Sequence, residues 1–245
     1  LESFAPLAFQ EDFDNCGLLI GNRHQTVEGI LICLDVTEAV VDEAITTKHN
    51  MIVCHHPLIF KGLKSLTGRN EVERCVMKAI KHDIAIYAAH TNLDSAPYGV
   101  SFRMAQKLGL EHIQVLVPKS DMLLKLVTFV PTEHLETLRE ALFAAGAGQI
   151  GQYDACSFSH NGEGTFRPGI GTNPFVGVMG EVHHEPESRL EVILPKHKQS
   201  AVVTALLQTH PYEEPAFDLI PLANEWSQVG LGVVGDFPQN YAEPD

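Results

Sequence analysis

The sequence has no uninterrupted apolar run of the roughly 18 residues that a membrane-spanning helix needs, so we expect a soluble protein. We expect no secretory signal peptide, and the five cysteines include no C-x-x-C pair. An odd number of widely spaced cysteines does not indicate a disulfide framework, and Cys33 and Cys54 lie in apolar runs where a small buried side chain is expected. These features favour a reducing cytoplasm.

Positive charge is also scarce. The 17 Lys and Arg residues against 31 Asp and Glu residues give a net charge of −14. Such a surface repels a phosphate backbone, so we expect no nucleic-acid partner, and an anionic substrate would need a bound cation to attract it. No Ser-His-Asp or Cys-His arrangement that could supply a nucleophile is evident. With 245 residues and 44% apolar composition, the chain can form one large or two smaller globular domains.

The first half of the chain alternates short apolar runs with amphipathic helices. This rhythm predicts βαβ units and an α/β core with a largely parallel sheet. Strands are expected at 29–34, 51–54 and 84–89, and helices at 38–49, 71–82 and near 100–108.

A second rhythm follows an expected linker at 115–121. It predicts a β-α-β-β-α-β order, which is typical of a ferredoxin-like α+β domain inserted into the core. The expected elements are strands at 123–130, in the Gly-rich stretch 154–166, at 189–194 and at 216–222, with helices at 133–145 and 198–209. The corresponding domains are 1–118 (the first half of the core), 119–228 (the insertion) and 229–245 (the return to the core).

Chemically active side chains follow three successive strands. Asp35 follows the first, His55 and His56 follow the second, and His90 and Asp94 follow the third. In open α/β sheets, ligands bind beyond the carboxyl ends of the strands, so we expect these groups to meet. Imidazole and carboxylate groups bind transition metals, which predicts a metal site. Neighbouring side chains at a strand end diverge, so His55 and His56 suit two adjacent ions better than one.

Each of these residues has a second interpretation. Asp35 can cap the helix that starts near Glu38, and we favour that role. Asp94 can begin a turn, but a bridging metal ligand is the preferred interpretation. His90 can be a ligand, a proton carrier or a donor that orients a carboxylate. Asp14 and Asn15 are expected in a turn that closes over the site, and contact with the ligands from behind is a second possibility.

Two glycine patterns carry less information. Gly230, Gly232 and Gly235 match G-x-G-x-x-G, but Asp236-Phe237-Pro238 follows where a helix should begin, so a strand that returns to the core is expected. The glycines between 162 and 169 predict a hairpin, with an anion-binding loop as a distant second interpretation.

Two further histidine clusters are expected to be structural. His183-His184-Glu185, flanked by Glu181 and Glu187, predicts a solvated loop, and a second metal site there is the less favoured interpretation. His210, near Glu213 and Glu214, lies in a loop held by two prolines, which favours a structural role or one near an oligomer contact. Trp226 is assigned to packing.

Four phrases of the sequence resemble the NIF-three-like proteins, also called GTP cyclohydrolase 1 type 2 homologues. A fifth phrase resembles part of the PII/CutA-like domain that is inserted in longer members of that family. The first four are 12–18 (DFDNCGL), 32–37 (ICLDVT), 55–60 (HHPLIF) and 89–94 (AHTNLD), and the fifth is 210–218 (HPYEEPAFD).

The resemblance implies a two-metal site in the α/β core and a ring-shaped homohexamer. It implies that His55, His56 and Asp94 are ligands, with His90 beside them. The family's remaining ligands are a His and a Glu in a C-terminal half that follows the insertion, and no His follows His210 here. We therefore expect that half to be absent from this chain and the site to be incomplete. Since the chain does not begin with Met, part of the N-terminus is also expected to be missing.

Two functions follow, and the sequence leaves open whether the protein is an enzyme. The first is a metal-dependent hydrolase of a small phosphorylated or nucleotide-like substrate, with two divalent ions (zinc, iron or manganese). In that scheme Asp94 fixes the ions and His90 transfers protons. The second is a metal-responsive regulator or metal carrier without turnover. A purely structural scaffold rests only on the ring-forming habit of the family.

Overall fold

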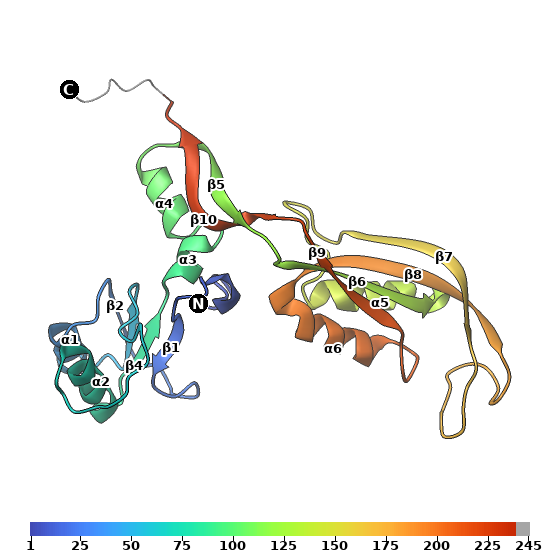
Figure 1. Cartoon of the computed structure of the whole chain (residues 1–245), viewed down its shortest axis with the longest axis horizontal. Coiled ribbons are helices and arrows are strands. Elements are labelled where there is room, and N and C mark those ends of the chain that lie inside the picture. The colour runs from blue at the N-terminus through green and yellow to red at the C-terminus, as the bar shows by residue number, and fades with distance from the viewer. Residues whose placement is uncertain (239–245) are drawn as a thin grey trace. The chain divides into compact units, whose positions relative to one another are not determined.

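The computed structural model describes residues 1–238 and divides the chain into two compact units (Figure 1). Unit 1 contains Leu1–Pro118 and the segment that starts at Gln228. Unit 2 is the continuous segment Lys119–Ser227. Of the expected return to the core at 229–245, the last seven residues lie outside the described part.

Unit 1 is built on a four-stranded sheet with the order β1-β4-β3-β2. Strands β2, β3 and β4 are parallel, as the alternating pattern predicted, whereas β1 pairs with β4 in antiparallel fashion and was not foreseen. In register, Cys33 is opposite Cys54 and Cys54 is opposite Ala88, so the three parallel strands end at the same level. The strands are β1 (Gly17–Ile20), β2 (Ile30–Cys33), β3 (Met51–Cys54) and β4 (Ala85–Ala88).

Helices α1 (Glu38–Thr46) and α2 (Glu71–Lys81) pack against this sheet through a shared apolar core. Helix α1 is capped by Thr37, whose hydroxyl accepts the Val40 N–H, so the cap assigned to Asp35 is wrong. Thr37 directly precedes the first residue of the helix and so occupies the capping position, whereas Asp35 lies two residues earlier, next to the end of β2.

Unit 1 also contains the 3-10 turn Leu7–Phe9, two short helices and a two-stranded sheet. The helices are α3 (Thr91–Ser95) and α4 (Val100–Lys107), and the sheet pairs β5 (Glu111–Lys119) with β10 (Trp226–Asp236).

Strand β5 corrects the expected linker at 115–121, most of which belongs to the strand. The strand expected at Gly230–Gly235 is present, but it pairs with β5 and not with the four-stranded sheet. A Cβ atom at Gly230 would overlap the carbonyl oxygen of Val117. The glycine therefore allows two backbones to approach closely.

Unit 2 is a four-stranded antiparallel sheet with two helices, in the order β-α-β-β-α-β along the chain. The spatial order is β7-β8-β6-β9. The elements are β6 (Leu123–Pro131), α5 (Leu135–Ala144), β7 (Ser157–Phe166), β8 (His183–Pro195), α6 (Gln199–Thr209) and β9 (Phe217–Leu222), with 3-10 turns at Thr132–His134 and Lys196–Lys198.

The two faces of this sheet differ. Alternate residues such as Leu126 and Leu190 are fully buried with the apolar sides of α5 and α6. The intervening residues, among them Phe129, Glu187 and Arg189, lie on the face without helices.

One local prediction in unit 2 is wrong and another is confirmed in part. His183-His184-Glu185 is part of β8 and is not a solvated loop, because the antiparallel ladder extends to the pair Phe166–His183. The predicted hairpin is formed by β7 and β8, but Gly162 and Gly164 lie inside β7, and the connection is the longer segment 167–182.

Candidate metal centre

The carboxyl ends of β3 and β4 bring three imidazole rings together. The ring centroids of His55 and His56 are 5.1 Å apart, and that of His90 lies 5.0 Å from His55 and 5.6 Å from His56. One ring nitrogen from each residue lies within 4.8 Å of the other two, so the cluster could hold a metal ion. The structure therefore brings together the three histidines that the strand-end pattern singled out.

Each ring is held by its Nδ1 atom. His55 Nδ1 is 2.9 Å from the Ala89 carbonyl oxygen, and His56 Nδ1 is 2.7 Å from Asp35 Oδ1. His90 Nδ1 is 3.0 Å from both carboxylate oxygens of Asp14. A carbonyl oxygen can only accept, so His55 carries its proton on Nδ1, and the carboxylates favour the same tautomer in the other two rings. This leaves the three Nε2 atoms as lone-pair donors, the arrangement found around bound metals.

Asp14 is the most firmly held of these acceptors, and its side chain is fully buried. Burial alone would raise the pKa of this carboxyl. Hydrogen bonds from the Thr91 hydroxyl, His90 and the Cys16 thiol outweigh it and hold the pKa well below the usual range. Asp14 is therefore an ionised acceptor that contacts the Nδ1 atom of His90, on the side of the ring away from Nε2.

The residues around Asp14 explain its position. Burial raises the pKa of the Cys16 thiol, which stays protonated and donates to Asp14 at 3.1 Å. The Asn15 side chain donates to the Ile59 carbonyl at 2.6 Å and so ties this loop to the segment that follows His56. From the sequence, a turn was the preferred interpretation of Asp14 and Asn15, and contact with the ligands was the second. Contacts that join residues 14 and 90 cannot be found from local pattern.

Asp94 lies at the edge of the cluster, within α3 and not in a turn. Its Oδ1 atom is 3.8 Å from His55 Nε2, too far for a hydrogen bond. Burial raises the pKa of this carboxyl, and the neighbouring His55 and His90 partly oppose that shift. The carboxylate thus faces the free nitrogen of His55 across a gap.

The segment before α3 is anchored by Asn92, which is 1% exposed. Its Oδ1 accepts the His90 N–H at 3.0 Å, and its Nδ2 donates to the Ala5 carbonyl at 2.8 Å. His90 is therefore fixed both through its backbone and through its ring. Sequence reasoning did not single out Asn92.

The remaining residues singled out in the sequence have structural contacts in unit 2. His210 is buried, with Nε2 2.9 Å from the Phe129 carbonyl oxygen and Nδ1 accepting the Tyr212 N–H at 3.1 Å. The Trp226 ring stacks on His197 with centroids 6.2 Å apart. Both packing roles agree with the sequence-based interpretation.

Comparisons with known proteins agree on one family. The family model described as Duf34/NIF3 (NGG1p interacting factor 3) matches residues 1–244. A protein of Halalkalibacterium halodurans named GTP cyclohydrolase 1 type 2 homolog is 47% identical over 235 residues, which is 96% of this chain and 63% of that protein. The Bacillus subtilis protein of the same name is 44% identical over the same shares.

A solved structure is also similar. A Bacillus cereus protein related to NIF3 superposes with a TM-score of 0.84 at 44% identity, covering 97% of this chain and 64% of that one. The mixed α/β fold matches it. The chain thus spans a little under two thirds of the length of the relatives that it matches. Within residues 1–238, no helix is long and apolar enough to cross a bilayer.

Proposed function

The chain belongs to the Duf34/NIF3 family, and from this membership we propose that it binds two divalent metal ions and hydrolyses a small phosphorylated or nucleotide-like substrate. The observation that carries the proposal is the common orientation of the three imidazoles. Each Nδ1 atom is engaged by an acceptor, so the Nε2 atoms remain to bind.

The donor set fits such ions. Imidazole nitrogens with one carboxylate suit zinc, iron or manganese better than calcium or magnesium, which prefer all-oxygen sites. His55, His56 and Asp94 would hold the ions, with His90 beside them, and Asp94 would be the carboxylate that fixes the pair. The family resemblance implies a further His and Glu as ligands, and the present sequence has no His after His210.

Bound divalent ions would supply Lewis acidity toward water and toward the bond under attack. The chain's own residues would do the rest. Asp14 keeps the Nδ1 atom of His90 protonated, which leaves its Nε2 atom to bind or to accept a proton from the reacting water. Asp35 orients His56 in the same manner.

A metal-responsive regulator or metal carrier is the second candidate. The β-α-β-β-α-β order of unit 2, which we assign to a ferredoxin-like domain of the PII/CutA type, favours it, because such a domain could report metal occupancy to a partner. We further propose a homohexamer, by resemblance to the family. We also propose a cytoplasmic location, consistent with five cysteines that form no disulfide.

Turnover separates the two candidates. Purified protein loaded with zinc, iron or manganese is assayed against a panel of phosphoesters and nucleotides, beside Asp94→Ala and the exposed control Asp154→Ala. We expect metal-dependent turnover that Asp94→Ala lowers at least about a hundredfold, while Asp154→Ala leaves it unchanged. Full metal occupancy with no turnover on any compound would favour the regulator or carrier instead.

A further inference from the structure

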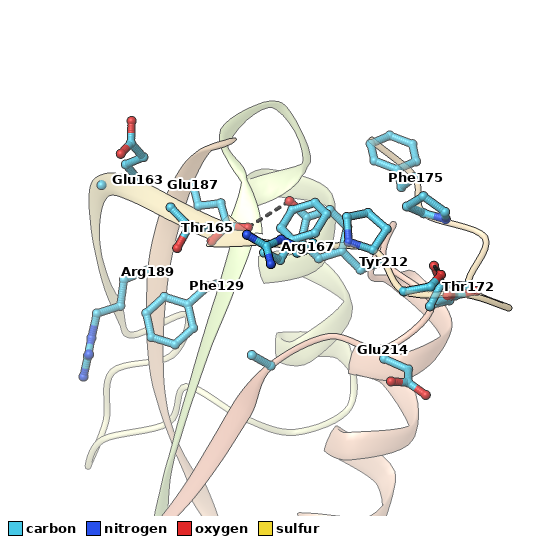
Figure 2. Close-up of a pocket in the computed structure, with 18 of the residues that line it drawn as sticks. Phe129, Glu163, Thr165, Arg167, Thr172, Phe175, Glu187, Arg189, Tyr212 and Glu214 are labelled. Carbon is cyan, nitrogen blue, oxygen red and sulfur yellow. Dashed lines mark hydrogen bonds between the residues drawn. The ribbon is translucent and has the colours of Figure 1, made fainter. Parts of the chain in front are cut away.

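Unit 2 contains a cavity of about 630 Å³ on the sheet face without helices, well within the 300–1,000 Å³ usual for small-molecule sites. Its floor is formed by positions of β6, β7 and β8 that point away from α5 and α6, including Phe129, Gly162, Glu187 and Arg189. Its rim comes from the segment after β7 and from the loop around Tyr212 (Figure 2). Three segments that are distant in sequence therefore enclose one space.

Aromatic rings make up much of the wall. Phe166 and Tyr212 have centroids 5.6 Å apart, and Phe175 lies 6.3 Å from Tyr212. Phe129 lies on the sheet itself, with the Arg189 guanidinium 5.7 Å from its ring centroid. Flat apolar faces of this kind favour a flat ligand that can stack on them.

A buried carboxylate provides the polar anchor. Glu187 is 8% exposed, and its Oε1 atom accepts the Tyr212 hydroxyl at 2.8 Å, the contact drawn as a dashed line in Figure 2. Burial, and then this bond, raises the pKa of Tyr212, so the phenol remains the donor. Within residues 1–238, no hydrogen bond reaches the second oxygen, Oε2. This acceptor is therefore available to a ligand.

Two glycines make this arrangement possible. A Cβ atom at Gly164 would overlap Glu187 Oε2, so only glycine lets the carboxylate lie against β7. Gly162, directly opposite Glu187 in the ladder, has no atom within 4 Å of its own Cβ position. The open space above the sheet therefore begins at Gly162.

The other charged groups at the cavity are mostly paired. Glu163 is 3.0 Å from His184, Glu213 accepts the Asn173 N–H, and Arg189 donates to Glu191. Arg167 and Glu214 are exposed and have no ion pair in the described chain, and their opposite charges give no net attraction for a phosphate. The ligand's decisive polar contact is thus an N–H donor directed at Glu187.

From this combination we propose that unit 2 binds a planar, amino-substituted heteroaromatic compound of the size of a nucleoside. The ring stacks among Phe129, Phe166 and Tyr212, and an exocyclic amino group donates to Glu187 Oε2. The site lies in unit 2, whereas the metal centre lies in unit 1, so this inference does not depend on the proposed hydrolysis.

Calorimetric titration of the purified protein with adenosine and guanosine tests the proposal. Purine riboside and inosine, which lack the respective amino groups, serve as matched comparators. We expect saturable binding of at least one amino-substituted nucleoside, about tenfold tighter than its comparator, because one hydrogen bond to a charged acceptor is lost. The 5′-monophosphates are expected to bind no more tightly than the nucleosides.

Substitutions at the cavity test whether the nucleoside binds there. Glu187→Gln is expected to weaken binding about tenfold, and the exposed control Glu140→Gln on α5 is expected to leave it unchanged. Gly162→Val, whose side chain enters open space and suits a strand, tests the cavity if Glu187→Gln impairs folding, and it is expected to abolish binding. Three results would overturn the proposal: no saturable binding of any nucleoside, binding that both unit 2 variants leave intact, or loss of binding only in His56→Ala.

Discussion

At the scale of single residues, the decisive feature of the candidate metal centre is the acceptor behind each histidine. The strand-end pattern predicted His55, His56 and His90 as neighbours, and the structure brings their ring nitrogens within 4.8 Å of one another. The pattern could not predict that Asp14 would lie against His90, because those residues are 76 positions apart. For Asp35 it favoured helix capping, since a cap is a local interaction and contact with His56 is not.

Asp14→Asn tests the role of this acceptor. An amide in place of the carboxylate has almost the same size but removes the charge, and one of the two acceptor atoms, that favour the Nδ1-protonated tautomer of His90. We expect metal affinity to fall about 10–100-fold, measured by competition with a chromophoric chelator. Asp154→Asn serves as the matched control. Unchanged affinity in Asp14→Asn, with the fold intact by circular dichroism, would assign Asp14 to the structure of the loop alone.

At the scale of elements, the parallel strands and their helices followed from apolar runs and amphipathic spacing. The errors occurred where pairing with a distant segment decides the structure. Strand β5 was interpreted as a linker because of its Pro118, and its pairing with β10, a segment more than 100 residues away, could not be predicted from local pattern. Likewise, His183–Glu185 is polar enough for a loop, but the ladder with β7 continues through it.

Gly230→Ala tests the pairing of β5 with β10. The added methyl group would overlap the Val117 carbonyl oxygen, so one of the two backbones must shift. We expect a loss of about 1–3 kcal/mol in the free energy of unfolding of unit 1, measured by denaturant titration. Gly62→Ala, at a position with no atom within 4 Å, is the matched control and is expected to change the stability little. Equal stability of the two variants would show that β5 and β10 accommodate the added methyl group without a loss in the free energy of unfolding.

At the scale of the whole molecule, the chain consists of two units that each have a separate apolar core. The candidate metal centre belongs to unit 1, and the aromatic cavity belongs to unit 2. A ligand that binds only the folded form of one unit stabilises that unit by mass action. We therefore expect metal binding to slow amide hydrogen exchange in unit 1, and nucleoside binding to slow it in unit 2.

Hydrogen exchange with and without added zinc tests this separation. At a zinc concentration of about 100 times Kd, we expect amide protection in β3, β4 and α3 to rise by up to about 2.7 kcal/mol, with β6 and β8 unchanged. Zinc can also bind exposed histidines outside the cluster. The triple variant His55→Ala, His56→Ala and His90→Ala is therefore the control for that binding. Increased protection in that variant, or protection confined to unit 2, would contradict the assignment.

The sequence by itself determined the chemistry of the strand ends. It placed Asp35, His55, His56, His90 and Asp94 beyond three successive apolar runs, and parallel strands bring such positions to a common edge. Only the tertiary structure decided which nitrogen of each ring is available and which carboxylate holds it, because the contacts of Asp14 and Asp35 cross between elements. The same holds for the cavity of unit 2. Its glycines, aromatic rings and buried Glu187 come from segments that only the folded sheet brings into register.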